Sequence, residues 1–288
     1  MFEGFSLERI DVGEALIRAR IGGAGPPVVL LHGHPRTHVT WHLVAPLLAE
    51  RYTVVCPDLR GYGESIGPPS TPDHEPYSKR AMGRDVHLLM EKLGFPRFAI
   101  VGHDRGAYVG FRLALDKPAA CSHLVIMDAV PILDALDRCD ARFARAWYHW
   151  FFFAQDAPRP ENAILADPDA WYSTSGKAEH MGDEAFADFH RAIHDPTVVH
   201  TMLEDYRAGL GIDRDHDEQD RRAGRQITCP TMILWALQDD MELLYGDPLA
   251  VWRGWVGRPF GQGLDCGHHI AEEAPEELAA LIIEHLAR

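Results

Sequence analysis

Short apolar runs alternate with stretches of helical periodicity along most of this 288-residue chain. Each run has the length of one strand and consists mostly of apolar residues, which indicates a strand that is buried on both faces. Strands of that kind, joined by helices, form a parallel sheet covered on both sides. We expect strands at 27–31, 52–56, 98–101, 123–127 and 231–235, and helices at about 40–50, 80–93, 105–116, 248–256 and 274–287.

The segment 131–222 breaks this alternation. It is rich in aromatic residues, histidine and aspartate, its periodicity is that of amphipathic helices, and it contains no clear strand. A helical insertion into one sheet domain explains this pattern, and it also explains a length that is large for one ordinary domain. We therefore expect an α/β core of residues 1–130 and 223–288 and a helical cap of residues 131–222.

Acidic residues outnumber basic ones, with 43 Asp and Glu against 28 Lys and Arg, which gives a formal net charge of −15. Such a chain repels nucleic acid and anionic membranes, so neither is an expected partner. No segment approaches the roughly 20 apolar residues of a membrane span, and the N-terminal residues do not read as a signal peptide. The cysteines are scattered and form no CxxC pair, which favours free thiols in a reducing cytoplasm over a zinc knuckle. They are Cys56, Cys121, Cys139, Cys229 and Cys266.

A G-x-D-x-G motif at residues 102–106, centred on Asp104, directly follows the expected strand 98–101 and precedes a helix. A strained turn of this type exposes one nucleophilic side chain at the edge of a sheet, and its glycines leave room for the backbone. The plainer alternative is an aspartate that only caps the helix. A second motif, H-G-H-P at residues 32–35, ends an earlier strand, where such a site takes a backbone donor for an oxyanion.

Together with D-L-R-G-Y-G-E-S at residues 58–65, these motifs resemble the α/β-hydrolase family across essentially the whole chain. The resemblance implies the α/β-hydrolase fold, a mostly parallel sheet flanked by helices with a helical cap inserted after the sixth strand. It also implies that Asp104 is the nucleophile and that the backbone N–H groups of His34 and Arg105 form the oxyanion hole.

An aspartate at this turn points to a particular reaction. A carboxylate with the ordinary pKa of about 4 is ionised at neutral pH and needs no base to activate it. It is a weak nucleophile toward esters and amides, but it can displace a leaving group from an sp³ carbon. The product is an ester on Asp104, which water must then hydrolyse with the help of a general base. Dehalogenation or epoxide opening is therefore favoured over serine-type esterase activity.

The base is expected on the loop after the last strand. By resemblance, the Gly267-His268 step places it at His268, and the neighbouring His269 is a competitor. The acid that orients the base is expected at Asp128, at the end of the strand 123–127. Asp239 or Asp240, after the next strand, is the alternative, because relatives use either location.

The aromatic run at residues 147–153 marks the cap, and its plain interpretation is a buried aromatic helix. The run contains His149 and Trp150, whose ring N–H groups could stabilise a departing halide. With Asp104, the E-D-Y-R-A-G segment at 204–209 and the residues around 32–41, this pair resembles the fluoroacetate (haloacetate) dehalogenases. The resemblance implies substrate- or halide-binding roles for a set of side chains that consists of Arg105, His149, Trp150, Tyr206 and Trp41.

One position departs from that group. The haloacetate enzymes clamp the substrate carboxylate with two arginines, whereas here Arg105 is followed, three residues later, by Tyr108. A single guanidinium orients a carboxylate less well, and Tyr108 would instead offer a hydroxyl and an apolar ring to the substrate. The tyrosine at this position therefore favours neutral halides and epoxides as substrates over what the family pattern alone would predict.

Three functions follow from these patterns. The first is a hydrolytic dehalogenase acting on small haloacids, and the second is an epoxide hydrolase in which Tyr148, Tyr172 or Tyr206 protonates the epoxide oxygen. The third is a non-catalytic binding protein of the same fold, which the intact set of catalytic residues disfavours. No metal-binding motif, Walker loop or dinucleotide fingerprint is present in the sequence, so we expect no cofactor. The expected partner is a small-molecule substrate, and an exposed cap or sheet edge could support a homodimer.

Overall fold

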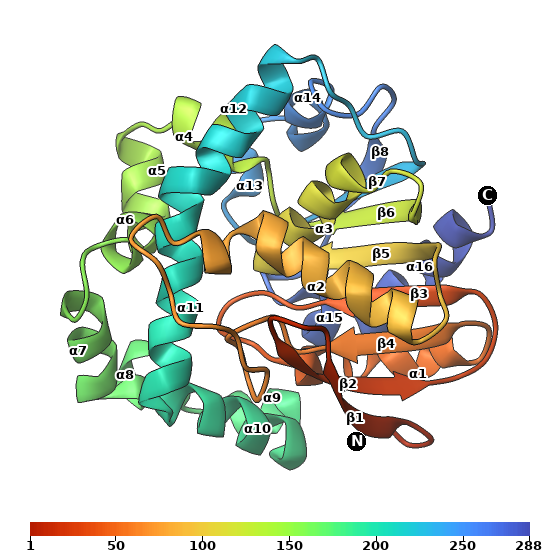
Figure 1. Ribbon diagram of the computed structural model, residues 1–288, viewed down its shortest axis with the longest axis horizontal. Coiled ribbons are helices and arrows are strands. Elements are labelled where there is room, and N and C mark those ends of the chain that lie inside the picture. Colours follow the sequence, from red (N-terminus) through yellow and green to blue (C-terminus); the bar gives the residue numbers. More distant parts are fainter.

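The protein, described here by a computed structural model of residues 1–288, is built around one eight-stranded sheet (Figure 1). The strand order is β1-β2-β4-β3-β5-β6-β7-β8. The first two strands form an antiparallel hairpin that joins β4, and every later pairing is parallel. The strands are β1 Ser6–Asp11, β2 Leu16–Gly22, β3 Pro27–Leu31, β4 Thr53–Pro57, β5 Phe98–His103, β6 Cys121–Met127, β7 Thr231–Ala236 and β8 Phe260–Leu264.

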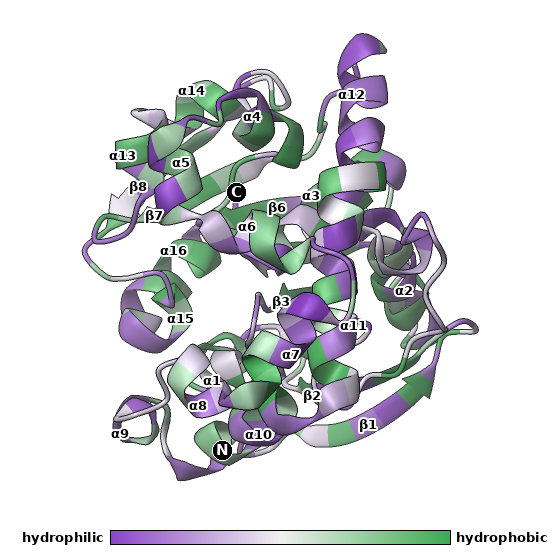
Figure 2. Cartoon of the chain, turned by 90° about the vertical axis from the view of Figure 1, so that its left-hand side faces the viewer, coloured by the Kyte–Doolittle hydropathy of each residue, from purple (hydrophilic) through white to green (hydrophobic).

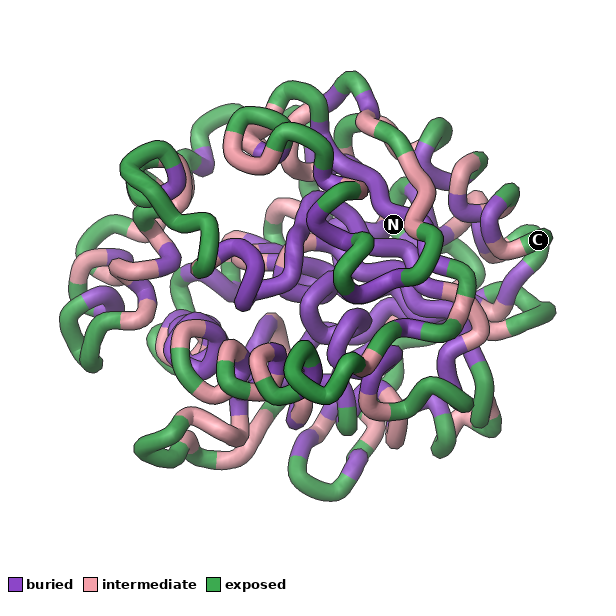
Figure 3. The backbone as a smooth tube through the Cα atoms, turned by 90° about the horizontal axis from the view of Figure 1, so that it is seen from above, coloured by how far each residue is buried: buried purple, intermediate pink, exposed green.

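Successive residues of the central strands point into two separate hydrophobic clusters, one on each face of the sheet. Val29 and Leu31 of β3 belong to the cluster under α2 (Lys79–Lys92) and α3 (Arg105–Asp116). Val28 and Leu30 of the same strand belong to the cluster under α1 (Val44–Ala49) and α16 (Pro275–Leu286). Figure 3 shows the strands as the buried centre of the molecule. This two-sided burial is the reason that the strands are almost continuously apolar.

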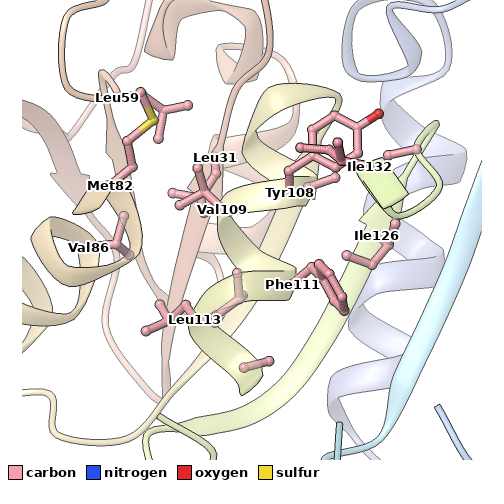
Figure 4. Close-up of a cluster of buried hydrophobic side chains, with 14 of the residues drawn as sticks. Leu31, Leu59, Met82, Val86, Tyr108, Val109, Phe111, Leu113, Ile126 and Ile132 are labelled. Atoms are coloured by element: carbon pink, nitrogen blue, oxygen red, sulfur yellow. The ribbon is translucent and has the colours of Figure 1, made fainter. Parts of the chain in front are cut away.

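The helix α3 is held against the sheet by its apolar side chains. Val109 and Leu113 lie with Leu31, Met82 and Val86 in the core shown in Figure 4. Burial of each such side chain stabilises the fold by about 1.5–3 kcal/mol. Because α3 begins directly after β5, this packing also fixes the turn between them.

All elements between β6 and β7 are helical, and together they form a layer beside the sheet (Figures 1 and 2). They include a π-helical turn, η3, and the hydrophilic helix α12. The cap elements are α4 Ile132–Asp137, α5 Ala141–Ala146, α6 Tyr148–Phe153, α7 Arg159–Ala166, α8 Pro168–Trp171, α9 Lys177–Met181, α10 Asp183–His194, α11 Pro196–Ala208, η3 Gly209–Asp213 and α12 Arg214–Arg222.

The predicted fold class is confirmed: a mostly parallel sheet is flanked by helices and is followed, after its sixth strand, by a helical insertion. The expected helix at 40–50 is in fact a 3-10 turn, η1 (His38–Trp41), and the separate α1. The expected helix at 248–256 ends earlier, as α14 (Pro248–Trp252). None of the helices has the length and apolarity that a membrane crossing requires. The remaining short elements are η2 Glu75–Tyr77, α13 Met241–Tyr245 and α15 Ile270–Glu273.

Candidate active site

Asp104 lies at the sharp turn between β5 and α3. Its backbone has φ +47° and ψ −115°, a conformation that is strained for a residue with a side chain. The flanking glycines are required by close packing. A Cβ on Gly106 would lie 2.4 Å from the carbonyl oxygen of Leu31, and one on Gly102 would lie 2.4 Å from that of Gly106. The G-x-D-x-G motif therefore has the steric reason that the sequence suggested, and the turn holds the Asp104 side chain at the sheet edge.

The loop after β3 approaches the Asp104 carboxylate from the other side. The backbone N–H of His34 donates a hydrogen bond of 2.7 Å to Oδ1 of Asp104. Gly33 makes this approach possible, because a Cβ there would lie 2.4 Å from the same oxygen. Arg105 supplies the first N–H of α3, and the first N–H groups of a helix have no partner within it. The His34 N–H thus bonds to the carboxylate, and the Arg105 N–H belongs to the same turn as Asp104.

His268 follows β8 and meets two carboxylates. Its Nδ1 atom lies 2.6 Å from Oδ2 of Asp128 and 3.0 Å from Oδ2 of Asp239. Asp128, just after β6, is buried, has φ +51°, and accepts a hydrogen bond from the backbone N–H of Ala236. Asp239 follows β7 and is 27% exposed at its side chain, so Asp128 is the closer and more buried of the two. Both positions that the sequence offered as alternatives therefore contact the same ring nitrogen.

The charges around His268 control its protonation. Removal from water by itself would lower the pKa of His268, but hydrogen bonds with Asp128 and Asp239 raise it well above the usual value, and the charge of Asp104 raises it further. Burial raises the pKa of Asp128. For Asp239, burial alone would also raise the pKa, yet the hydrogen bond with His268 lowers it below the usual range. The carboxylates around the imidazole therefore favour its protonated form.

These groups open into one cavity of about 330 Å³ between the sheet edge and the cap. Asp104, His268, Asp128 and Asp239 line it, together with His269 from the same loop. No lysine or arginine is among the lining residues. The cap contributes mostly aromatic side chains, among which are Trp147, Tyr148, His149, Trp150, Phe153, Trp171, Tyr172 and Tyr206.

The predicted halide-binding side chains His149, Trp150 and Tyr206 all reach this cavity. Burial lowers the pKa of His149 to about 4, so its imidazole is neutral at neutral pH and carries one N–H. The Trp150 indole supplies a second neutral donor, and its ring lies edge-on to that of Tyr108, which also lines the cavity. These neutral donors line the same cavity as the Asp104 carboxylate.

Arg105 does not line the cavity, which corrects the expectation that its side chain contacts the substrate. The guanidinium is fully buried and donates from Nε and Nη2 to the two carboxylate oxygens of Asp205, both at 2.9 Å. Its Cζ lies 4.1 Å from the ring centroid of Tyr206. Asp205 is held in turn by Lys79 and by the Tyr62 hydroxyl. This ion pair between Arg105 of α3 and Asp205 of α11 fixes the cap helix onto α3.

Trp41 is a second correction. Its side chain is fully buried with Val28, Leu30 and Val44 in the core cluster under α1, and it does not line the cavity. An aromatic residue near the H-G-H-P motif is equally suited to a core position, and packing takes it there.

His269 lies next to His268 in the chain but makes no hydrogen bond with Asp128 or Asp239. It lines the cavity, but its Nδ1 is buried without a hydrogen-bond partner, and burial lowers its pKa well below the usual value. Sequence reasoning did not identify the Asp205 partner of Arg105, or the contact of the Tyr172 hydroxyl with Nε2 of His34, at 3.3 Å. The E-D-Y-R-A-G segment contains the only signal for the former.

Comparison with known proteins shows the family of the chain and agrees with its fold. A family model described as alpha/beta hydrolase fold matches residues 26–275. A fluoroacetate dehalogenase from Burkholderia sp is 40% identical, with 100% of this chain and 95% of the relative covered. A soluble epoxide hydrolase from Corynebacterium sp. (strain C12) is 30% identical, with 88% and 87% covered. The crystal structure of ALR0039 from Nostoc sp PCC 7120 is 42% identical, with both chains covered completely and a TM-score of 0.96.

Proposed function

The chain belongs to the α/β-hydrolase family, and from that premise we propose that it is a hydrolytic dehalogenase that cleaves carbon–halogen bonds of small haloacids through an ester on Asp104. The observation that carries the proposal is that one cavity brings the Asp104 carboxylate, the His268 base and the neutral donors of His149 and Trp150 together. The 40% identity to a fluoroacetate dehalogenase supports the same reaction.

In the first step an oxygen of Asp104 attacks the carbon that bears the halogen. The new C–O bond forms as the carbon–halogen bond breaks, and the halide leaves with the bonding electron pair. Negative charge grows on the halogen during this step. The N–H groups of His149 and Trp150, with the Tyr206 hydroxyl, stabilise that charge without having to transfer a proton.

In the second step water attacks the carbonyl carbon of the Asp104 ester. His268 takes a proton from this water through Nε2, because its Nδ1 is occupied by Asp128 and Asp239. The oxyanion that forms on Asp104 accepts hydrogen bonds from the N–H groups of His34 and Arg105. Collapse of the intermediate breaks its bond to the alcohol oxygen, which takes the proton from His268. The carboxyl group of Asp104, now with one oxygen from water, loses the remaining proton of that water and is again a carboxylate.

The electrostatics couple the two steps. While Asp104 is ionised, its charge helps to raise the pKa of His268. Formation of the ester removes that smaller contribution, while Asp128 and Asp239 continue to raise the pKa of His268. The proton on His268 therefore has to pass to solvent before the imidazole takes one from the attacking water.

The absence of arginine and lysine from the cavity lining bears on substrate choice. Arg105 is paired with Asp205, and Tyr108 stands where a second clamp arginine would be. We therefore expect haloacids to be accepted, but without a strict requirement for their carboxylate, so that small neutral halides also react.

Epoxide opening is the second candidate. The hydroxyls of Tyr172 and Tyr206 belong to residues of the same cavity and could protonate an epoxide oxygen as Asp104 attacks the ring. The 30% identity to a soluble epoxide hydrolase supports this alternative. The same Asp104 and His268 would serve both reactions.

A substrate panel distinguishes these functions. Halide release from haloacetates and haloalkanes, and diol formation from epoxides, are measured for the wild type and for Asp104→Asn as the matched inactive control. Halide release that disappears in the variant supports the dehalogenase. Diol formation without halide release would favour the epoxide hydrolase, and no turnover on any of the three classes would contradict both.

A further inference from the structure

Two histidines and an aspartate meet on the cap, outside the catalytic cavity. His190 and His194 lie one turn apart on α10, so their side chains share one face of the helix, and their ring centroids are 4.1 Å apart. Asp169 on α8 reaches both of them. Its Oδ1 lies 3.1 Å from Nε2 of His190, and its Oδ2 lies 3.2 Å from Nε2 of His194. The helices α8 and α10 lie at the same end of the cap (Figures 1 and 2).

The spacing of these atoms suits a zinc ion. Zinc binds imidazole nitrogen and carboxylate oxygen at about 2.0–2.2 Å, which puts neighbouring ligand atoms about 3.3 Å apart in a tetrahedral site. The distance of 3.1 Å from Nε2 of His190 to Oδ1 of Asp169 is close to that value, and Nε2 of His194 lies 3.2 Å from the other oxygen of the same carboxylate. All three ligand atoms lie within 4.8 Å of one another.

Hydrogen bonds orient two of the three side chains. Nδ1 of His194 lies 2.8 Å from the carbonyl oxygen of His190, so this nitrogen carries the proton and donates it there. The other ring nitrogen, Nε2, faces Asp169 and is the atom that would bind the ion. The Thr174 hydroxyl donates to Oδ1 of Asp169 at 2.6 Å, an outer contact of the type that fixes metal-binding carboxylates.

We propose that His190, His194 and Asp169 bind one Zn²⁺ ion, with water completing its coordination. The three side chains are 39%, 35% and 46% exposed, so the ion and its water can enter from solvent. Two imidazoles select zinc and related transition-metal ions over Mg²⁺ and Ca²⁺, which prefer oxygen ligands.

The ion would tie α8 to α10. Trp171 and Tyr172 follow Asp169 by two and three residues in the chain, and both line the catalytic cavity. Bound zinc therefore fixes the cap segment that supplies one wall of that cavity. This site does not depend on which substrate the cavity accepts.

The direct test is calorimetric titration of the untagged, chelator-treated protein with Zn²⁺. We expect one saturable equivalent per chain and a rise in the melting temperature with zinc. His190→Ala and His194→Ala should each weaken binding by more than tenfold, and Thr174→Val by about tenfold. The matched control is His180→Ala, which removes an exposed histidine of α9 that bonds only to the carbonyl oxygen of Gly176, and it should bind zinc as the wild type does.

Circular dichroism in the presence of chelator establishes that the variants are folded. Loss of zinc binding and of the zinc-dependent melting shift in folded His190→Ala and His194→Ala supports the proposal. Binding that these variants retain would place the ion elsewhere, for example at His268 and Asp128 in the cavity, and would overturn it. Absence of saturable zinc uptake by the wild type would also overturn it, because the three side chains would then form ordinary ion pairs.

Discussion

The guanidinium of Arg105 and the carboxylate of Asp205 form a fully buried, two-pronged ion pair, with both N···O distances at 2.9 Å. Arg105 follows the nucleophile in the chain, and Asp205 belongs to the cap helix α11. The pair therefore joins the catalytic turn to the cap. It also removes from the cavity the one arginine that the sequence placed next to the substrate.

Asp205→Asn should destabilise the protein by about 3–5 kcal/mol, because it leaves the charges of Arg105 and Lys79 buried with a weaker partner. Urea unfolding measures this loss. Glu284→Gln is the matched control, since it breaks an exposed ion pair with Arg288 and should cost about 0–1 kcal/mol. Equal losses for both variants would contradict the structural role of the buried pair.

The same pair predicts a pH dependence of stability. Arg105 and Lys79 hold the pKa of Asp205 below its usual range, although burial alone would raise it. A lowered pKa in the folded state stabilises the protein above the unfolded value of about 3.9 and loses that effect as the pH falls below it. The stability difference between wild type and Asp205→Asn should therefore be largest near neutral pH and shrink in acid.

We expect both carboxylates that contact His268, those of Asp128 and Asp239, to orient its imidazole. We expect Asp128→Asn to lower kcat more than Asp239→Asn, because Asp128 is closer and more buried. The double variant should lose on the order of 10⁴-fold, as when a triad loses its only acid. Steady-state halide release measures these losses, and each single substitution should move the rise of activity with pH to lower pH.

Asp240→Asn is the control for this pair, since Asp240 lines the cavity without contacting His268, and its effect should be small. A double variant with wild-type kcat would show that neither carboxylate orients the base.

Much of this organisation can be predicted from sequence because it lies in short motifs. The elbow around Asp104, the His34 loop and the ends of β6 and β7 are each contained in a few adjacent residues that follow an apolar strand. Parallel strands bring these ends to one edge, so their side chains converge. The prediction of His268 depends instead on the family resemblance of the Gly267-His268 step.

Other features depend on contacts between distant segments, which no local pattern reveals. The Arg105–Asp205 pair joins residues 100 positions apart, and the Asp169–His190 contact crosses between two cap helices. Trp41 illustrates the opposite error, because an aromatic side chain near a motif is as well suited to the core as to a substrate. The strands β1, β2 and β8 were not predicted, because S-L-E-R-I-D, L-I-R-A-R-I-G and F-G-Q-G-L contain no continuous apolar run.

Tyr108→Arg should raise kcat/KM for a haloacetate relative to a neutral halide. A charge-assisted bond to a carboxylate is worth about 1.5–3 kcal/mol, so a change of roughly tenfold or more in the ratio is expected. Tyr148→Arg is the control, because it adds the same charge to a cavity residue that is 55% exposed, and the ratio should change less. An unchanged ratio in folded Tyr108→Arg would mean that this position does not set the preference for carboxylates.

His268→Ala should still form the ester but fail to hydrolyse it. The intact mass of the protein after substrate addition should increase by the mass of the substrate residue without its halogen. His269→Ala, which alters the neighbouring ring without touching Asp128 or Asp239, should not accumulate the ester. Multiple turnovers by His268→Ala would identify a different base.

The central claim is that water attacks Asp104 and not the substrate. A single turnover in heavy-oxygen water, with enzyme in excess, tests it by mass spectrometry of the product and of the peptide that contains Asp104. The account predicts label in Asp104 and unlabelled oxygen in the alcohol formed in that turnover. Label in the first-turnover product, with none in Asp104, would contradict the covalent mechanism.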